Sequence, residues 1–329
     1  MANIPMTLAC WDYDRMLPLA DGRVSAEGID LTFLPLMMPE PAFRMLHHGE
    51  FEAAEMSLAW YVRTVEAEKR PFIAIPVFPS RMFRHSCVYV NADSGIQRPE
   101  DLVGKRVGMP EYQMTAAVWL KGILADHHGV PVDSVSYFTG GLEQPGRTEV
   151  ALTPPPGISI EPIPADRTLA TMLETGEIDA LYTAHMPSTF KDGKGAVRRL
   201  WTDSATVEQQ YYQETSIFPI MHVIVVRQDV YEQRPWVVRS LMKAFEEAKD
   251  LAYEELRQTT ALKYMLPWMV DEAERTDQFF GGNPFTYGLE ENRHVLETFL
   301  RYAHEQGLTS RTLSPDDLFA PSTLKVSKI

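Results

Sequence analysis

Strand-like and helix-like segments alternate along the first part of the chain. Residues 29–34 alternate between apolar and polar side chains with a period of two, which is typical of a half-buried strand. Residues 39–48 follow with apolar side chains at helical spacing, and Gly49 ends that pattern. Further strands are expected at residues 7–11, 53–58 and 72–78, and a further helix at residues 60–69. This alternation predicts an α/β fold with a largely parallel sheet.

After Val90 the pattern is interrupted by polar and glycine residues, and a second α/β unit begins. Residues 140–164 are rich in proline and glycine and predict a loop with one hairpin. Asp166 is a suitable N-cap for a helix that ends before Gly176. The remaining elements expected in this unit are strands at 105–109, 135–138 and 179–183 and a helix at 115–126.

Two apolar strands, at residues 86–90 and 218–226, bound this middle unit, and the chain after it is helical. Helices are expected from Pro235 onward, at residues 262–270 and at residues 292–306. We therefore predict two lobes with a substrate cleft between them. The first lobe carries both termini and comprises residues 1–90 and 225–329, and the inserted lobe comprises residues 91–224.

Composition narrows the classes of partner. The chain has 329 residues, 45% of them hydrophobic and 23% charged, as is ordinary for a globular protein. The 31 basic and 45 acidic residues give a net charge of −14, which disfavours nucleic acid or an anionic membrane as a partner. Oligomeric state is not indicated by the sequence, and a homo-oligomer is left open.

The ends and the cysteines indicate the compartment. The N-terminus has no basic region, and Asp12 and Asp14 interrupt its apolar run, so it does not resemble a secretory signal. No apolar run approaches the ~18 residues that a membrane span needs. We expect a cytoplasmic protein with two buried free thiols, Cys10 and Cys87.

A basic cluster lies at the junction between the first lobe and the inserted lobe. Arg81, Arg84 and His85 follow a buried strand, and buried charges need an anion or a partner charge. In a chain that is acidic overall, such a cluster predicts a site for a small carboxylate. The alternative is a surface loop with solvated charges.

Several phrases resemble substrate-binding proteins of the type II periplasmic-binding-protein architecture, among them residues 28–31, 101–108 and 173–180. Three others, residues 78–86, 218–222 and 287–293, resemble the 4,5-dihydroxyphthalate decarboxylase family more specifically. The resemblance covers nearly the whole chain. It implies a two-lobed enzyme that removes CO2 from a hydroxylated aromatic acid, most specifically 4,5-dihydroxyphthalate, giving protocatechuate.

That reaction requires a bound carboxylate and a proton donor for the ring carbon. Arg81 and Arg84 are the candidate carboxylate ligands, because a guanidinium binds a carboxylate through two hydrogen bonds; a salt bridge within the lobe is the alternative. His85 and His222, near the two boundary strands, are the candidates for proton transfer, although a lone histidine on an apolar strand is more often structural. Glu55 ends a strand and is expected to orient a histidine or to bind a ring hydroxyl; a helix cap or a salt bridge is the alternative.

The other candidate substrate-binding residues follow strands or precede a helix. Trp11 and Tyr13, with Asp14 and Arg15, follow the first strand, where aromatic side chains suit a ring; Trp11 is equally compatible with a core position. The further candidates are Ser57, Glu111, Thr115 and His185. Thr115 begins a helix whose free N–H groups suit a carboxylate, whereas Glu111 adds a negative charge nearby.

The sequence predicts catalysis without a cofactor. The pairs His47–His48 and His127–His128 point about 100° apart on a helix, which makes them poor joint metal ligands. No zinc-binding, Walker or dinucleotide-binding motif is present. A divalent metal is the minority alternative. For function, the alternatives are a solute-binding protein for an aromatic or sulfonate-like anion and a biosynthetic enzyme that acts on another ring.

Overall fold

The computed structural model describes residues 2–147, 154–191, 193 and 195–324. The chain divides into two compact units, each with its own mixed sheet. Unit 1 comprises Met1–Arg81, Ile220–Leu296 and Ser314–Ile329, and unit 2 comprises Met82–Pro219 and Glu297–Leu313.

The last predicted helix, α11 (Arg293–Glu305), is divided between the two units. The predicted first lobe included all of it, but Glu297–Leu313 groups with unit 2. The packing explains this, because the rings of Phe299 and Tyr302 lie 5.4 and 5.7 Å from Trp119 of unit 2.

The sheet of unit 1 has the described strand order β2-β1-β3-β11-β4. Only part of it is parallel: β1 pairs in parallel with β2 and β3, whereas β11 is antiparallel to both of its neighbours. The strands in sheet order are β2 (Ile29–Pro35), β1 (Ile4–Cys10), β3 (Ala53–Ser57), β11 (Ile220–Arg227) and β4 (Phe72–Arg81).

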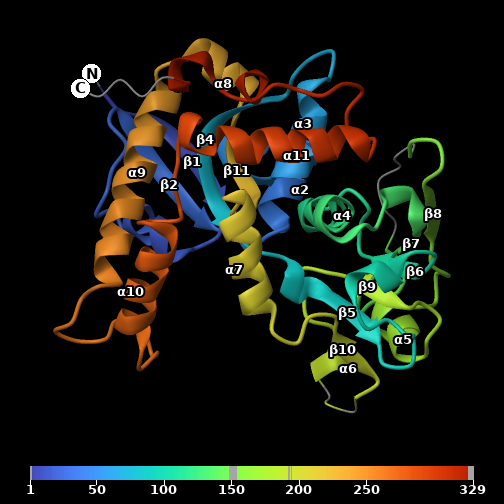
Figure 1. The fold of residues 1–329 in the computed structure, drawn as a ribbon. Helices are drawn as coiled ribbons and strands as arrows, with labels where there is room; N and C mark the ends of the chain where they lie inside the picture. The colour runs from blue at the N-terminus through green and yellow to red at the C-terminus, as the bar shows by residue number, and fades with distance from the viewer. Residues whose placement is uncertain (1, 148–153, 192, 194, 325–329) are drawn as a thin grey trace. The chain divides into compact units, whose positions relative to one another are not determined.

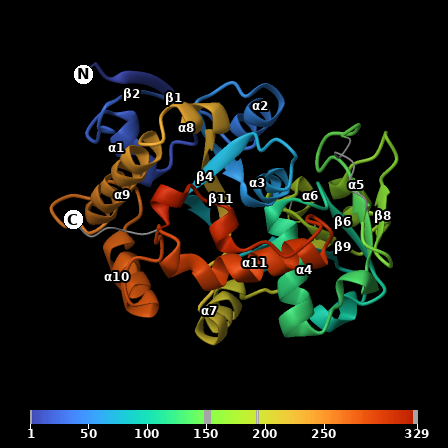
Figure 2. The ribbon, with the colours of Figure 1, turned by 90° about the horizontal axis from the view of Figure 1, so that it is seen from above.

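The predicted helix from Pro235 is α9 (Val237–Glu255), which lies along this sheet (Figures 1 and 2). Its apolar stripe, including Leu241 and Phe245, is buried. The other helices of unit 1 are α1 (Leu17–Ala20), α2 (Glu40–His48), α3 (Leu58–Val65), α8 (Gln228–Gln233) and α10 (Met269–Phe280), with the 3₁₀ turn η1 (Asp14–Met16).

The predicted helix at 262–270 is wrong. Residues 261–268 form a loop, and α10 starts only at Met269. Pro267 has no N–H to donate and disfavours a helical backbone at Leu266. Met265 and Trp268 are consequently exposed rather than packed on a helix face.

The strand β4 bulges where it passes β11. Ile224 pairs with Ile75, but His222, two residues earlier, pairs with Ser80. The extra residues 76–79 begin and end with proline, which cannot donate a ladder hydrogen bond. The bulge brings Ser80 opposite His222.

The sheet of unit 2 has the described order β10-β5-β9-β6-β7-β8. Strands β9, β6, β7 and β8 run parallel, whereas β5 is antiparallel to β9 and β10. The strands in sheet order are β10 (Val197–Arg199), β5 (Val88–Asn91), β9 (Ala180–Tyr182), β6 (Arg106–Met109), β7 (Ser136–Thr139) and β8 (Ser159–Pro162). The helices are α4 (Thr115–His128), α5 (Leu169–Glu174), α6 (Ser188–Lys191) and α7 (Ser204–Thr215), and η2 (His85–Cys87) is a 3₁₀ turn.

In unit 2 the structure differs from three local predictions. The N-cap of α5 is Thr168 rather than Asp166, because the Thr168 hydroxyl accepts a hydrogen bond from the Thr171 N–H. In the predicted proline-rich loop, β8 pairs in parallel with β7 instead of forming a hairpin, and residues 148–153 lie outside the described residues. The strand expected at 86–90 begins only at Val88, because η2 precedes it.

Within the described ranges, every helix is too short or too polar to cross a membrane.

Candidate functional site

Polar side chains gather on one face of the sheet of unit 1. The strand pairing places His222 of β11 opposite Ser57 of β3 on one side and opposite Ser80 of β4 on the other. Glu55 lies two residues before Ser57 and therefore points to the same face. Residues placed diagonally on adjacent strands are within reach of long side chains, and this register brings Glu55 to His222.

Glu55 is fully buried and is surrounded by hydrogen-bond donors. Its Oε1 lies 2.6 Å from Nδ1 of His222 and accepts a 2.7 Å hydrogen bond from the Tyr13 hydroxyl. Its Oε2 accepts hydrogen bonds from the Trp11 N–H at 3.1 Å and from the Cys10 thiol at 3.4 Å. Burial acts to raise the pKa of Glu55, but the charge of His222 and these hydrogen bonds outweigh it and lower the pKa. The carboxylate is therefore ionised.

An ionised carboxylate only accepts hydrogen bonds, and this fixes the tautomer of His222. Nδ1 must carry a proton toward Glu55, so Nε2 is the nitrogen that can exchange a proton with another molecule. The His222 side chain keeps 18% of its surface exposed while Glu55 has none. A buried acid behind a partly exposed imidazole is an arrangement suited to general acid–base catalysis.

Aromatic and thiol groups complete this part of unit 1. Trp11 is 39% exposed and its ring lies edge-on to that of Tyr13, 5.1 Å away, so it is not a core residue. Burial and the neighbouring Glu55 charge raise the pKa of both Tyr13 and Cys10, which keeps them protonated as donors. The expectation of two buried free cysteines is confirmed.

Arg81, the candidate carboxylate ligand of unit 1, is buried and contacts the protein. Its Nη2 donates to the Thr286 carbonyl at 2.8 Å and to the side-chain oxygen of Asn292. Its guanidinium also lies over the ring of Phe78. Substrate binding by Arg81 stays a prediction.

His85, predicted to act in proton transfer, is in unit 2 and is fully buried. Its ring lies 5.2 Å from Trp201 and 5.3 Å from Tyr211, and Nδ1 lies 4.0 Å from Oε1 of Glu208. Among the described residues, neither ring nitrogen has a hydrogen-bond partner. Burial, and then the charges of His127 and His128, lower the pKa of His85 to about 4. The ring is therefore neutral near pH 7, and its catalytic role stays a prediction.

The other candidates of unit 2 lie in separate local settings. Arg84 is buried with Nη1 3.8 Å from the Cys87 sulfur, and Glu111 is buried in an ion pair with Arg147. Thr115 begins α4, as predicted. His185 follows β9 and is exposed, and its N–H donates to the Thr183 hydroxyl.

The sequence did not single out Ser80 or the contact between Cys10 and Glu55. The position of Ser80 opposite His222 depends on the bulge in β4, which periodicity does not reveal. A usable signal was Glu55 itself, a charged residue inside a short strand that is otherwise apolar or small. In the described part of the chain, no group of three or more His, Cys, Asp or Glu residues is arranged to hold a metal ion.

Comparison with known proteins agrees with the resemblance seen in the sequence. The chain is 40% identical over 330 residues to a 4,5-dihydroxyphthalate decarboxylase of Comamonas testosteroni, covering 100% of both chains. This chain belongs to the 4,5-dihydroxyphthalate decarboxylase family. The family consists of carboxy-lyases. A second member, from Pseudomonas putida, is 38% identical over 217 residues, which are 66% of this chain and 84% of that relative.

The fold relates this decarboxylase family to binding proteins. Residues 26–141 match the protein family described as NMT1/THI5 like. A periplasmic sulfonate-binding protein of Methylobacillus flagellatus has a similar structure, with a TM-score of 0.55 at 14% identity, over 98% of this chain and 94% of that one. The predicted α/β, periplasmic-binding-protein-like fold is confirmed. At this identity the likeness concerns the fold alone.

Proposed function

We propose that this protein decarboxylates 4,5-dihydroxyphthalate to protocatechuate, with His222 as the general acid. The observation that carries the proposal is the Glu55–His222 pair, joined at 2.6 Å in a chain that belongs to the decarboxylase family. Two relatives are named for this activity, and one of them matches the whole chain.

The chemistry needs a proton delivered to the ring carbon that bears the departing carboxylate. The hydroxyl para to that carbon supplies electron density, and Nε2 of His222 donates the proton, forming the new C–H bond. The C–C bond then breaks, its electron pair restores the aromatic ring, and CO2 leaves. Overall, one proton is consumed and one CO2 is released. Glu55 holds Nδ1–H and stabilises the imidazolium form that donates.

Binding of the substrate is assigned to the groups that surround this histidine. The exposed face of Trp11 packs against the ring, and the hydroxyl groups of Ser57 and Ser80, which flank His222, bind ring substituents. Arg81 and Arg84 are the candidate ligands for the carboxylates, as the sequence predicts.

The proposed reaction uses no cofactor, because proton transfer and loss of CO2 from an electron-rich ring need only acid–base groups. We also propose a cytoplasmic location, with which the two buried free thiols, Cys10 and Cys87, are compatible. Fractionation of expressing cells tests the location, and activity after chelator treatment tests the absence of a metal.

The decisive experiment measures CO2 release from 4,5-dihydroxyphthalate and from a panel of hydroxybenzoates by purified protein. We expect turnover that survives chelator and falls at least about 100-fold in His222→Ala. His48→Ala, an exposed histidine of the same unit, is the matched control and should keep wild-type kinetics. Tight binding without turnover would instead support the solute-binding alternative, and turnover of another ring alone would support the biosynthetic one.

A further inference from the structure

All three nitrogens of the Arg15 guanidinium donate hydrogen bonds to protein oxygens. Nε donates to the Pro79 carbonyl at 2.6 Å, Nη2 donates to the same oxygen, and Nη1 donates to the Asp14 carboxylate at 3.0 Å. Cζ also lies over two aromatic rings, 4.2 Å from the centre of Tyr13 and 4.6 Å from that of Phe285. Only 15% of the side chain is exposed.

Two of these contacts connect Arg15 with residues beside Glu55 and His222, the acid–base pair. The Tyr13 ring, against which Arg15 stacks, places its hydroxyl 2.7 Å from Oε1 of Glu55. Pro79, whose carbonyl Arg15 binds, directly precedes Ser80, the residue opposite His222. Arg15 therefore connects the segment after β1 with the bulge of β4, and the Glu55–His222 pair lies between them.

We propose that Arg15 is a positioning residue for the Glu55–His222 pair. By fixing the Tyr13 ring and the Pro79 carbonyl together, it sets the separation of the two segments that flank the pair. This inference rests on the proposed function, since it assigns Arg15 a part in the same proton transfer.

The contacts require a guanidinium rather than any positive charge. Two N–H groups of a planar fork converge on one carbonyl, and two aromatic rings lie within cation–π distance of the same guanidinium. A lysine ammonium would reach one carbonyl but would lose both the second hydrogen bond and the flat stacking. Arg15→Lys therefore separates charge from geometry.

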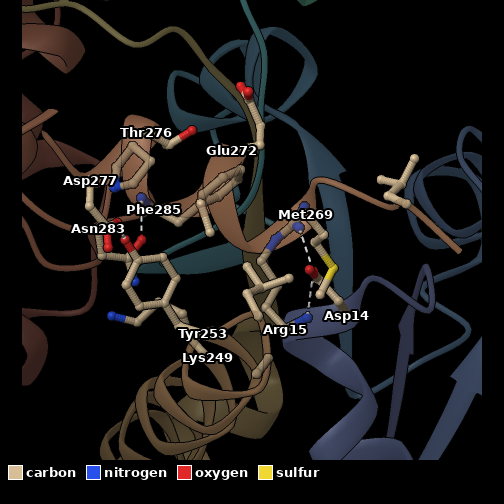
Figure 3. A pocket seen from close by; sticks show the side chains of 15 residues that line it. Asp14, Arg15, Lys249, Tyr253, Met269, Glu272, Thr276, Asp277, Asn283 and Phe285 are labelled. Carbon is tan, nitrogen blue, oxygen red and sulfur yellow. Dashed lines mark hydrogen bonds and ion pairs between the residues drawn. The ribbon is translucent and has the colours of Figure 1, made fainter. Parts of the chain in front are cut away.

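A substrate-anchoring role for Arg15 is the competing possibility, and the structure argues against it. All three guanidinium nitrogens already bind protein oxygens. On its other side Arg15 borders a pocket of about 250 Å³ between α9 and α10, whose wall is mostly apolar. Figure 3 shows Arg15 and Asp14 at one wall of this pocket and Asp277 and Tyr253 at the opposite wall.

The pocket provides a direct chemical test. In Arg15→Ala the deleted guanidinium leaves a space that opens into the pocket, so methylguanidinium added to the solution can reach it. We expect Arg15→Ala to lower kcat about 10–100-fold with KM changed less than about threefold. Arg15→Lys should be impaired to a similar extent, and methylguanidinium should restore part of kcat to Arg15→Ala only. Phe285→Leu removes one stacking face, keeps the hydrogen bonds, and should give a smaller loss of kcat.

A second readout does not depend on turnover. The ¹H and ¹⁵N NMR signals of the His222 ring, recorded at pH 7, should shift in Arg15→Ala relative to the wild type. Arg275→Ala, which replaces an exposed arginine on α10, should match the wild type in both the His222 signals and the kinetics.

The kinetics and the NMR signals separate a failure of the proposed function from a failure of the positioning role. If the protein releases no CO2 but the NMR signals of the His222 ring still shift in Arg15→Ala, the proposed function fails and the positioning role stands. Wild-type kinetics and unchanged His222 signals in Arg15→Ala would overturn the positioning role while the activity stands. A rise in KM at unchanged kcat would overturn it in favour of substrate anchoring.

Discussion

Replacing Glu55 with glutamine should move the proton of His222 from one ring nitrogen to the other. In the native protein both carboxylate oxygens face donors, His222 and Tyr13 at Oε1 and the Trp11 N–H and the Cys10 thiol at Oε2. An amide has only one oxygen, and the backbone N–H of Trp11 cannot reverse its role. The amide oxygen will therefore face Trp11, and the amide NH2 will face His222 and Tyr13.

This arrangement is satisfied only if His222 accepts at Nδ1 and carries its proton on Nε2, while the Tyr13 hydroxyl rotates to accept. The imidazolium form loses its counter-charge, so donation from Nε2 becomes unfavourable. We expect kcat to fall about 10²–10⁴-fold, the range for loss of a general acid or of its correct tautomer.

The same change should destabilise the protein. A buried hydrogen bond to a charged group contributes about 1.5–3 kcal/mol, and here one charge-assisted contact becomes neutral. For a domain of this size that corresponds to a fall in Tm of about 4–10 °C at pH 7. The pKa of Glu55 lies below its ordinary value of 4.5, so its stabilising contribution is present above that pH and is lost as the pH falls through the lower folded value. The difference in stability between wild type and Glu55→Gln should therefore narrow below about pH 4.

The assay combines ¹⁵N NMR of the histidine rings, CO2 release and thermal unfolding at pH 7 and pH 3.5. Glu68→Gln, an exposed change in the same unit, is the control and should alter none of the three. The reasoning would be refuted if Nδ1 of His222 kept its proton in Glu55→Gln. It would also be refuted if kcat stayed within threefold of wild type.

Three further changes test other parts of the molecule. His85 has a folded pKa of about 4, below its unfolded value, so protonation favours the unfolded state. The free energy of unfolding should therefore fall by about 3 kcal/mol from pH 6.5 to 4. His85→Leu should flatten this pH dependence in urea titrations, and an unchanged pH dependence would contradict the lowered pKa of His85. Trp11→Leu should raise KM several-fold with little change in kcat, and an unchanged KM would remove Trp11 from the binding surface. Gly122→Ala should cost about 1–3 kcal/mol in stability, because the added Cβ would lie 2.3 Å from the Tyr302 ring; a Tm equal to that of wild type would show that the ring moves freely aside.

Periodicity and end signals predicted most elements of the fold. Gly49 and Gly129 end α2 and α4 with positive φ, as the sequence suggested. The failure at 262–270 has a physical cause, since the apolar side chains there are at helical spacing but Pro267 removes a backbone donor in the middle. A largely parallel sheet was expected, yet strand direction depends on long-range connections that a local pattern does not contain.

For the candidate site, the types of residue could be predicted from the sequence, but which side chains contact one another could not. His222 was chosen because histidine suits proton transfer and lies on a boundary strand, and Glu55 because it ends a strand and could orient a histidine. Their pairing required the register of β3 with β11, which brings together two side chains that are 167 positions apart in the sequence. Arg15 was visible only as a residue after the first strand, because its contact with β4 is made to the Pro79 backbone carbonyl, and backbone groups carry no signature in the sequence.

The prolines of the β4 bulge have a consequence for how the chain behaves before it finishes folding. In the described strand order β4 is the last strand of its sheet, and an outer strand offers unpaired N–H groups to strands of other molecules. Pro76 and Pro79 have no N–H to offer, and near the start of the strand Phe319 bridges to Ala74 and Ala320 donates to the Ala74 carbonyl. Replacing both prolines should therefore first cause aggregation during expression, before any effect on catalysis could be measured.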